Sequence, residues 1–222
     1  MESHKGIYYP TESRDSCGVI KSLLSNRIWE RRIVELYKTI VKKGDIVLDC
    51  GAFIGLHTLE LSKLVEDTGK VYSFEPIPAV ADCVEKTMEE KNINNVVLVR
   101  KPLYSSSNIK LEFVSDLSGL SSVADYRRKA FKYKYKANSI CIDDFINIPD
   151  DKKITFIKID VEGSEYKVLE GAIKTIKKYR PTIIFETWKN KRNINKLLNW
   201  CEIHSYNMTY LSCDNYVLDP IY

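Results

Sequence analysis

The chain has 222 residues, of which 44% are hydrophobic and 29% are charged, with a formal net charge of +4. That length suits one α/β structural domain, and so mild a charge neither requires nor excludes an anionic substrate. No apolar stretch approaches the roughly 20 residues that cross a bilayer, and the N-terminus does not resemble a signal peptide, so we expect no membrane insertion. The 6 cysteines form no C-x-x-C pair, which favours a reducing, cytoplasmic location over a disulfide framework or a zinc site.

The predicted architecture starts with an N-terminal strap and helix, residues 1–44, that lead into a core of residues 45–222. Residues 1–25 carry little hydrophobic periodicity and are interrupted by glycine and proline, so a loose segment is expected there. Apolar residues then recur at helical spacing from Trp29 to Lys42, which predicts a helix.

Short apolar runs alternate with helical segments through the core. The runs predict strands over residues 46–50, 70–75, 96–99, 154–159 and 182–185. The segments between and after them predict helices over residues 55–66, 78–91, 164–179 and 194–203. Residues 103–140 are irregular apart from an edge strand at 109–114, and residues 206–218 predict a hairpin. Strands that alternate with helices and are apolar throughout predict a parallel, doubly wound sheet.

A glycine-punctuated turn follows the first strand of the core. Asp49 ends the apolar run, and Gly51 and Gly55 allow a ligand to approach the backbone at the start of the next helix. Glu75 follows the second strand a little over twenty residues later, where an acid can bind a ribose diol. The glycines are not spaced as in G-x-G-x-x-G, which argues against a nicotinamide oxidoreductase.

Acidic residues close four of the predicted strands: Asp49, Glu75, Asp160 and Glu186. Ligands of doubly wound sheets bind outside the carboxyl ends of the strands, so this coincidence favours a site. Asp160 and Glu186 follow neighbouring strands and are hard oxygen ligands suited to Mg²⁺ or Mn²⁺. The alternative is that acids here cap the following helices and that Asp160 only orients a substrate.

Five sequence elements resemble those of the FkbM-type methyltransferases: Trp29-Glu30, Asp49 to Thr58, Phe74-Glu75-Pro76, Ile157 to Glu165, and Arg180 to Glu186. The resemblance runs from about Tyr8 to Glu186, and Lys-Ile-Asp-Val-Glu-Gly at 158–163 is its most specific part. It implies a class I, Rossmann-like methyltransferase fold with a seven-stranded, mostly parallel sheet whose C-terminal strand is reversed. It also implies S-adenosylmethionine as cofactor and methyl transfer to a sugar or glycan hydroxyl, with Mg²⁺ or Mn²⁺ as a candidate aid.

The resemblance also assigns site residues. The expected cofactor-binding residues are Asp49, Gly51, Ala52, Phe53, Gly55, Thr58, Glu75, Pro76, Ile77 and Tyr104. The expected catalytic residues are Asp160, Glu162 and Glu186, with Asp160 and Glu186 as candidate metal ligands. His57, one turn into the cofactor helix, is expected to pack or to line the cofactor rather than act as a base.

Residues 125–136 mix basic and aromatic side chains and have two interpretations. They are either an acceptor-facing wall, in which Tyr126, Tyr133 and Tyr135 stack on a sugar, or an edge strand whose alternating lysines discourage pairing. The alternatives to a sugar acceptor are RNA, a small phenol, or an inactive binding module. No larger basic patch accompanies this stretch, so no nucleic-acid partner is expected. Separately, the sequence is compatible with a domain of a larger glycan-modifying enzyme.

Overall fold

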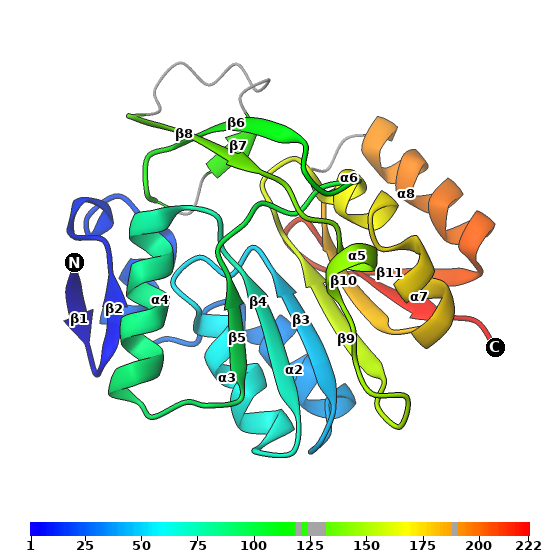
Figure 1. The fold of residues 1–222 in the computed structure, drawn as a ribbon, viewed down its shortest axis with the longest axis horizontal. Coiled ribbons are helices and arrows are strands. Elements are labelled where there is room, and N and C mark those ends of the chain that lie inside the picture. Colours follow the sequence, from blue (N-terminus) through cyan, green and yellow to red (C-terminus); the bar gives the residue numbers. More distant parts are fainter. Residues whose placement is uncertain (119–120, 124–131, 188–190) are drawn as a thin grey trace.

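The computed structural model describes residues 1–118, 121–123, 132–187 and 191–222. A seven-stranded sheet forms its centre, in the order β11-β12-β10-β9-β3-β4-β5 (Figure 1). Its strands are β3 (Ile46–Cys50), β4 (Lys70–Phe74), β5 (Val96–Val99), β9 (Ile154–Ile159), β10 (Thr182–Glu186), β11 (Tyr206–Ser212) and β12 (Asn215–Pro220). Neighbouring strands are parallel except for β12, which is antiparallel to both β10 and β11. The predicted sheet with one reversed strand is therefore confirmed.

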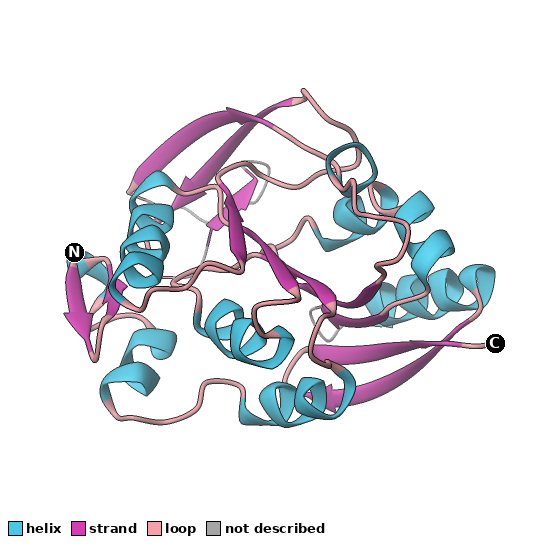
Figure 2. Ribbon diagram, turned by 60° about the horizontal axis from the view of Figure 1, so that its bottom comes forward, coloured by secondary structure: helices cyan, strands magenta, loops and turns pink. Residues whose placement is uncertain are grey.

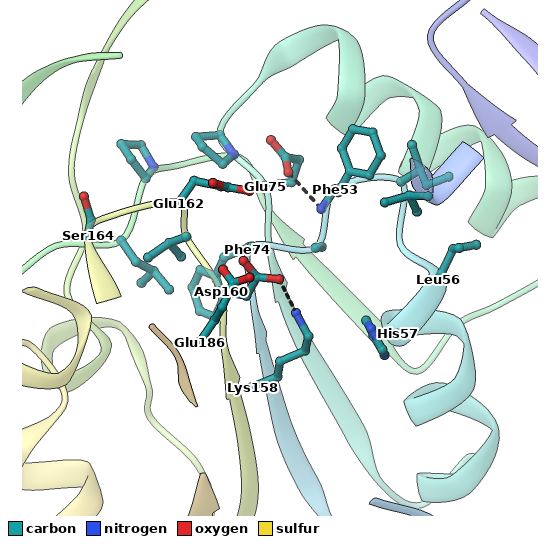
Figure 3. A pocket seen from close by; sticks show the side chains of 18 of the residues that line it. Phe53, Leu56, His57, Phe74, Glu75, Lys158, Asp160, Glu162, Ser164 and Glu186 are labelled. Carbon is teal, nitrogen blue, oxygen red and sulfur yellow. Dashed lines mark hydrogen bonds and ion pairs between the residues drawn. The ribbon is translucent and has the colours of Figure 1, made fainter. Parts of the chain in front are cut away.

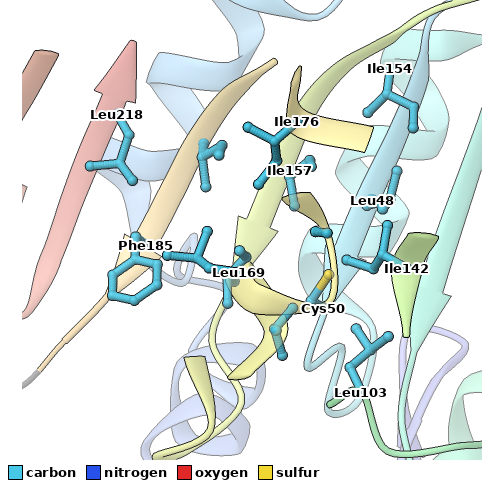
Figure 4. Close-up of a cluster of buried hydrophobic side chains, with 14 of the residues drawn as sticks. Leu48, Cys50, Leu103, Ile142, Ile154, Ile157, Leu169, Ile176, Phe185 and Leu218 are labelled. Atoms are coloured by element: carbon cyan, nitrogen blue, oxygen red, sulfur yellow. The ribbon is translucent and has the colours of Figure 1, made fainter. Parts of the chain in front are cut away.

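Helices cover both faces of this sheet (Figure 2). They are α2 (Arg31–Ile40), α3 (Leu56–Val65), α4 (Pro78–Glu90), α5 (Ile142–Phe145), α6 (Glu165–Glu170), α7 (Ile173–Tyr179) and α8 (Lys191–His204). Alternate residues of β3 serve the two faces: Val47 packs with α2 and α3, whereas Leu48 and Cys50 pack with α5, α6 and α7 (Figure 4). Because both faces of the sheet are buried, β3 needs apolar side chains on both, and Ile46, Val47 and Leu48 form an unbroken apolar run.

The prediction of a single helix over residues 164–179 is wrong, because this segment forms two helices, α6 and α7, separated at Gly171. A Cβ atom on Gly171 would lie 2.2 Å from the carbonyl oxygen of Tyr104. The Gly171 carbonyl also accepts the backbone N–H of Asp143 at 2.9 Å. The break lets a neighbouring loop pack directly on the helix backbone, and apolar periodicity alone does not report such an approach.

Residues 1–25 are not the loose segment that was expected. They form the hairpin β1 (Glu2–His4) and β2 (Ile7–Tyr9), a 3₁₀ turn (Thr11–Ser13) and the helix α1 (Gly18–Leu24). The backbone N–H of Tyr8 donates to Thr87 Oγ1 of α4 at 2.9 Å, and Tyr9 is fully buried. Tertiary packing therefore orders a stretch whose strands are too short to show a periodic pattern.

A three-stranded sheet, in the order β7-β6-β8, forms a separate layer from β6 (Lys110–Ser115), β7 (Ser121–Val123) and β8 (Tyr133–Asn138) (Figure 1). The expectation that residues 109–114 form an edge strand is wrong, because β6 pairs on both sides. The two edges are β7 and β8, and along β8 Lys134 and Lys136 are exposed while Tyr133 and Tyr135 pack inward. The edge-strand interpretation of this stretch is confirmed for its described part, and Tyr126 lies outside the described residues.

Across those described ranges, none of the helices combines the length and the apolar character needed to cross a membrane.

Candidate active site

A cavity of about 370 Å³ opens at the carboxyl ends of β3, β4, β9 and β10 (Figure 3). Its floor comes from the last residues of these strands and the loops after them, which supply Gly51 to Ile54, Phe74 to Pro76, Asp160 to Glu162, and Glu186. The N-terminal segment adds Trp29 and Glu30, and the β6 layer adds Phe113. The cavity therefore lies where doubly wound sheets bind their ligands.

Gly51 permits the closest backbone approach in this cavity. Its φ is +90°, and a Cβ atom would lie 1.7 Å from the carbonyl oxygen of Asp160. Its N–H donates to the Phe74 carbonyl at 3.1 Å. The loop after β3 is therefore pressed between the ends of β4 and β9, an arrangement open only to glycine. Gly55, at φ +78°, immediately precedes α3.

Glu75 is held rigidly at the rim of β4. Its two carboxylate oxygens accept the N–H groups of Phe53 at 2.9 Å and Ile77 at 2.8 Å, and the residue is 5% exposed. Burial raises the pKa of Glu75 to about 8, although both hydrogen bonds favour the ionised form. Each oxygen keeps a further lone pair. A fixed acceptor pair that lines the cavity suits the ribose diol of an adenosine cofactor.

The other predicted cofactor residues divide into two groups. Gly51, Ala52, Phe53, Glu75 and Pro76 line the cavity. Asp49, Gly55, Thr58, Ile77 and Tyr104 do not, and Lys101 to Leu103 line it near the place expected for Tyr104. Asp49 is fully buried and accepts the hydroxyl of Thr58 at 2.6 Å, so this pair lies beneath the glycine loop.

Lys158 is a site residue that we did not predict individually. It is the last residue but one of β9, is 2% exposed, and donates from Nζ to Asp160 Oδ2 at 2.7 Å (Figure 3). Burial by itself would lower its pKa, but the carboxylates of Asp160 and Glu30 outweigh burial and hold the pKa above its ordinary value. The sequence could have indicated this role, because Lys158 is the one charged residue in an otherwise apolar strand. A lysine buried in such a strand requires a partner of opposite charge.

Glu30 links the N-terminal segment to the cavity. One of its carboxylate oxygens lies 2.9 Å from His57 Nε2, and the other accepts the side-chain amide of Asn215 at 3.0 Å. Burial opposes ionisation of Glu30, but the hydrogen bond to His57 and the charge of Lys158 hold its pKa below the ordinary value. His57 itself lines the cavity, in line with the role expected for it.

Three carboxylates meet at the ends of β9 and β10. The side chains of Asp160, Glu162 and Glu186 each place one oxygen within 4.8 Å of the other two. Burial and the neighbouring charge of Asp160 raise the pKa of Glu186 to about 11. Burial opposes the ionisation of Asp160, but the charge of Lys158 holds the pKa of Asp160 below its ordinary value. The structure thus brings all three predicted catalytic residues together.

The turn that carries Glu162 has an unusual backbone. Glu162 adopts φ +56°, and the next residue, Gly163, adopts φ +107°. The buried carboxylate of Glu165 accepts the N–H groups of Val161 at 3.2 Å and Gly163 at 2.7 Å. Such left-handed residues persist only where their surroundings fix them, so Glu165 holds Glu162 toward the cavity.

The sheet order, the reversed β12 and the cavity at the strand ends define the fold of a class I S-adenosylmethionine-dependent methyltransferase. Residues 49–208 match the model of the methyltransferase FkbM domain. The chain belongs to this FkbM methyltransferase family, as the sequence resemblance predicted.

Solved structures share the fold. An FkbM methyltransferase from Methylobacillus flagellatus KT has a TM-score of 0.57 at 17% identity, with 90% of this chain and 52% of that chain covered. A putative rRNA methylase from Clostridium thermocellum has a TM-score of 0.56 at 13% identity, with coverages of 85% and 92%. Identities this low establish a common fold and nothing about the acceptor.

Curated relatives match over part of their length. "Methyltransferase 1" of Beauveria bassiana (strain ARSEF 2860) is 25% identical over 143 residues, which are 56% of this chain and 57% of that protein. A probable cobalt-precorrin-6B C(15)-methyltransferase (decarboxylating) of Saccharolobus solfataricus is 29% identical over 118 residues, 51% of this chain and 59% of that protein. The chain thus spans less than two thirds of either relative.

Proposed function

We propose that the protein is an O-methyltransferase that transfers the methyl group of S-adenosylmethionine to a hydroxyl of a sugar or glycan. The observation that carries this proposal is the group of three carboxylates, Asp160, Glu162 and Glu186, beside the cofactor cavity. Carboxylates accept hydrogen bonds from hydroxyls, so this group favours a neutral polyol at the reacting centre. The same negative charge disfavours the phosphates that flank every RNA hydroxyl.

The protein's part in the reaction is to hold and orient two reactants. When bound, S-adenosylmethionine supplies an electrophilic methyl on its sulfonium. Glu75 binds the ribose diol and fixes the cofactor along the glycine loop. Asp160, anchored by Lys158, accepts the hydrogen bond of the acceptor hydroxyl and so orients its oxygen. With the cofactor bound, that oxygen would take the methyl group from the sulfonium sulfur, and Asp160 would accept the hydroxyl proton.

The same carboxylates have the composition of a divalent metal site. Asp160, Glu162 and Glu186 offer hard oxygen ligands of the kind that Mg²⁺ and Mn²⁺ prefer. Lys158 donates to one oxygen of Asp160, and Glu186 also hydrogen-bonds to this carboxylate. A cation held there would lower the pKa of a coordinated hydroxyl, which is useful because a sugar hydroxyl is a weak acid. We therefore include metal stimulation in the proposal.

The proposal is tested by methyl transfer from radiolabelled S-adenosylmethionine to neutral glycosides, an RNA oligonucleotide and catechol, each with Mg²⁺, Mn²⁺ or EDTA. We expect transfer to glycosides, stimulation by metal, and little change between low and physiological salt. Asp160→Asn should lower turnover by about 10²–10⁴-fold, the usual effect of losing a proton acceptor, while S-adenosylhomocysteine still binds. Asp150→Asn, in the exposed turn before β9, is the control.

Each acceptor used in this experiment distinguishes a different substrate class. Transfer only to RNA, with activity that collapses as salt rises, would replace the sugar with a nucleic acid. Transfer only to catechol would indicate a phenolic acceptor, whose hydroxyl ionises more readily. Full activity in EDTA would remove the metal and leave Asp160 as the proton acceptor. An Asp160→Asn variant with wild-type turnover would exclude Asp160 from the mechanism.

A further inference from the structure

A second cavity, of about 380 Å³, adjoins the first at the end of β10. Glu186 lines both cavities, so an acceptor hydroxyl at the carboxylate group would have the rest of its molecule beside this second space. Helices α6 and α8 form its walls, through Tyr166 and Lys167 on one side and Arg192 and Lys196 on the other. The volume lies within the range of small-molecule sites, which is roughly 300–1,000 Å³.

The cavity is lined by three basic side chains, Lys167, Arg192 and Lys196, and by two acidic ones, Glu165 and Glu186. Arg192 and Lys196 are exposed, lie one helical turn apart on α8, and form no ion pair within the part of the chain that the structure describes. Lys167 differs, because its ammonium already contacts Glu170 at 2.7 Å. Of the two carboxyl groups in the cavity, that of Glu165 accepts the backbone N–H groups of Val161 and Gly163, and that of Glu186 belongs to the three-carboxylate group. Within the described residues, neither forms an ion pair with Arg192 or Lys196.

Tyr166 makes this arrangement rigid. Its hydroxyl donates to the backbone carbonyl of Asn193 at 2.7 Å, which ties α6 to α8. The ammonium of Lys196 lies 3.8 Å from the centre of the Tyr166 ring, a cation–π contact that holds the charge at the wall of the cavity. The two walls and one of the two cations are thus positioned before any ligand arrives, which reduces the entropy lost on binding.

We propose that this second cavity binds an anionic substituent, a phosphate or a carboxylate, of the sugar whose hydroxyl is methylated beside Asp160 and Glu186. The inference rests on the proposed function. It assigns a neutral group to one end of the acceptor and a negative charge to the other. The end that reacts is a neutral polyol held by carboxylates. The end that anchors is an anion held by Arg192 and Lys196.

The test is calorimetric binding to the full chain saturated with S-adenosylhomocysteine. The probes are glucose 1-phosphate, glucuronate, glucose and inorganic phosphate. We expect an anionic sugar to bind at least about tenfold more tightly than glucose, the scale of one charge-assisted hydrogen bond. The double variant Arg192→Gln/Lys196→Gln should lose this advantage and leave the affinity for glucose unchanged. Lys177→Gln/Lys178→Gln on α7 removes the same charge outside the cavity and should behave as wild type.

The outcomes separate this inference from the proposed function. Preference for glucose 1-phosphate identifies a phosphate as the anchor, and preference for glucuronate identifies a carboxylate. Equal binding of glucose and both anionic sugars, or an advantage that survives in the double variant, overturns the inference. So does inorganic phosphate binding as tightly as glucose 1-phosphate, because the sugar would then contribute nothing. Anion-dependent binding without methyl transfer to any sugar would overturn the proposed function and retain the anion site.

Discussion

At the residue scale, Glu75 offers the sharpest test of where the cofactor binds. Glu75→Ala removes the fixed acceptor pair beside the glycine loop. We expect S-adenosylhomocysteine to bind about 1–3 kcal/mol more weakly, the usual cost of leaving a buried hydrogen-bonding group without its partner, as measured by calorimetry. Glu89→Ala, an exposed position on α4, controls for the loss of one carboxylate. Unchanged affinity in Glu75→Ala would remove Glu75 from the cofactor site, and tight binding of NAD by the wild type would overturn the cofactor assignment itself.

Glu165 predicts a pH-dependent stability. Burial raises its pKa to about 7, whereas the unfolded chain ionises near the ordinary value of about 4.3. Ionisation therefore favours the unfolded chain, and stability is lost as pH rises from about 4 to 7. Glu165→Gln keeps the oxygen that accepts both backbone N–H groups and removes the charge. We expect this variant to gain up to about 3 kcal/mol in free energy of unfolding at pH 8, with no gain near pH 4.

Urea denaturation at both pH values measures this difference. Glu170→Gln, an exposed residue at the end of α6, should show no comparable gain. An equal gain for Glu165→Gln at pH 4 and pH 8 would mean that its charge is not the cause.

Single residues also show which parts of the site can be predicted from sequence patterns. The strand-end acids were predictable, because each follows an apolar run and parallel strands bring such ends together. Lys158 was not predicted, because its buried charge depends on the distant Glu30 as well as on the nearby Asp160. Asp49 and Thr58 were predicted as cofactor ligands, and the structure places both beneath the loop. Sequence spacing locates a loop but not which of its side chains face a ligand.

At the scale of elements, the loop between β3 and α3 depends on Gly51. Gly51→Ala would place a Cβ atom against the Asp160 carbonyl at a φ that alanine rarely adopts. We expect a loss of more than about 2 kcal/mol in free energy of unfolding together with weaker cofactor binding. Gly18→Ala is a matched control in the same cavity, since its Cβ would meet Trp29 at 3.7 Å, an ordinary contact, and its expected change is within about 0.5 kcal/mol. Similar stability of the two variants would contradict this account of the loop.

The boundaries of helices and strands were predictable where local sequence sets them and were missed where contacts between distant residues set them. Strand and helix positions through the core were predictable from local periodicity. The division between α6 and α7 was not, because it reflects the close approach of the Tyr104 loop to Gly171. The formation of β1 and β2 likewise depends on packing against α4, which lies far along the sequence.

At the scale of the whole molecule, the cavity is enclosed by three layers that are distant in sequence. Trp29 comes from the N-terminal segment, Phe113 from the β6 layer, and Glu186 from the central sheet. The sequence predicted the sheet and its site because that part follows a widely shared pattern. The enclosing walls could not be placed in advance, since their position depends on packing between those layers, as in the contact of Ser13 with the Leu117 carbonyl.

The position of β12 has a consequence for how the protein is made. β12 lies between β10 and β11 in the sheet but follows both in the chain. During translation, β10 therefore presents an unpaired edge containing Ile183, Ile184 and Phe185 until β12 leaves the ribosome. β11 reaches the sheet only through β12, so it cannot protect that edge earlier. The demand for chaperones during synthesis should therefore concentrate on β10 and end once β12 has emerged.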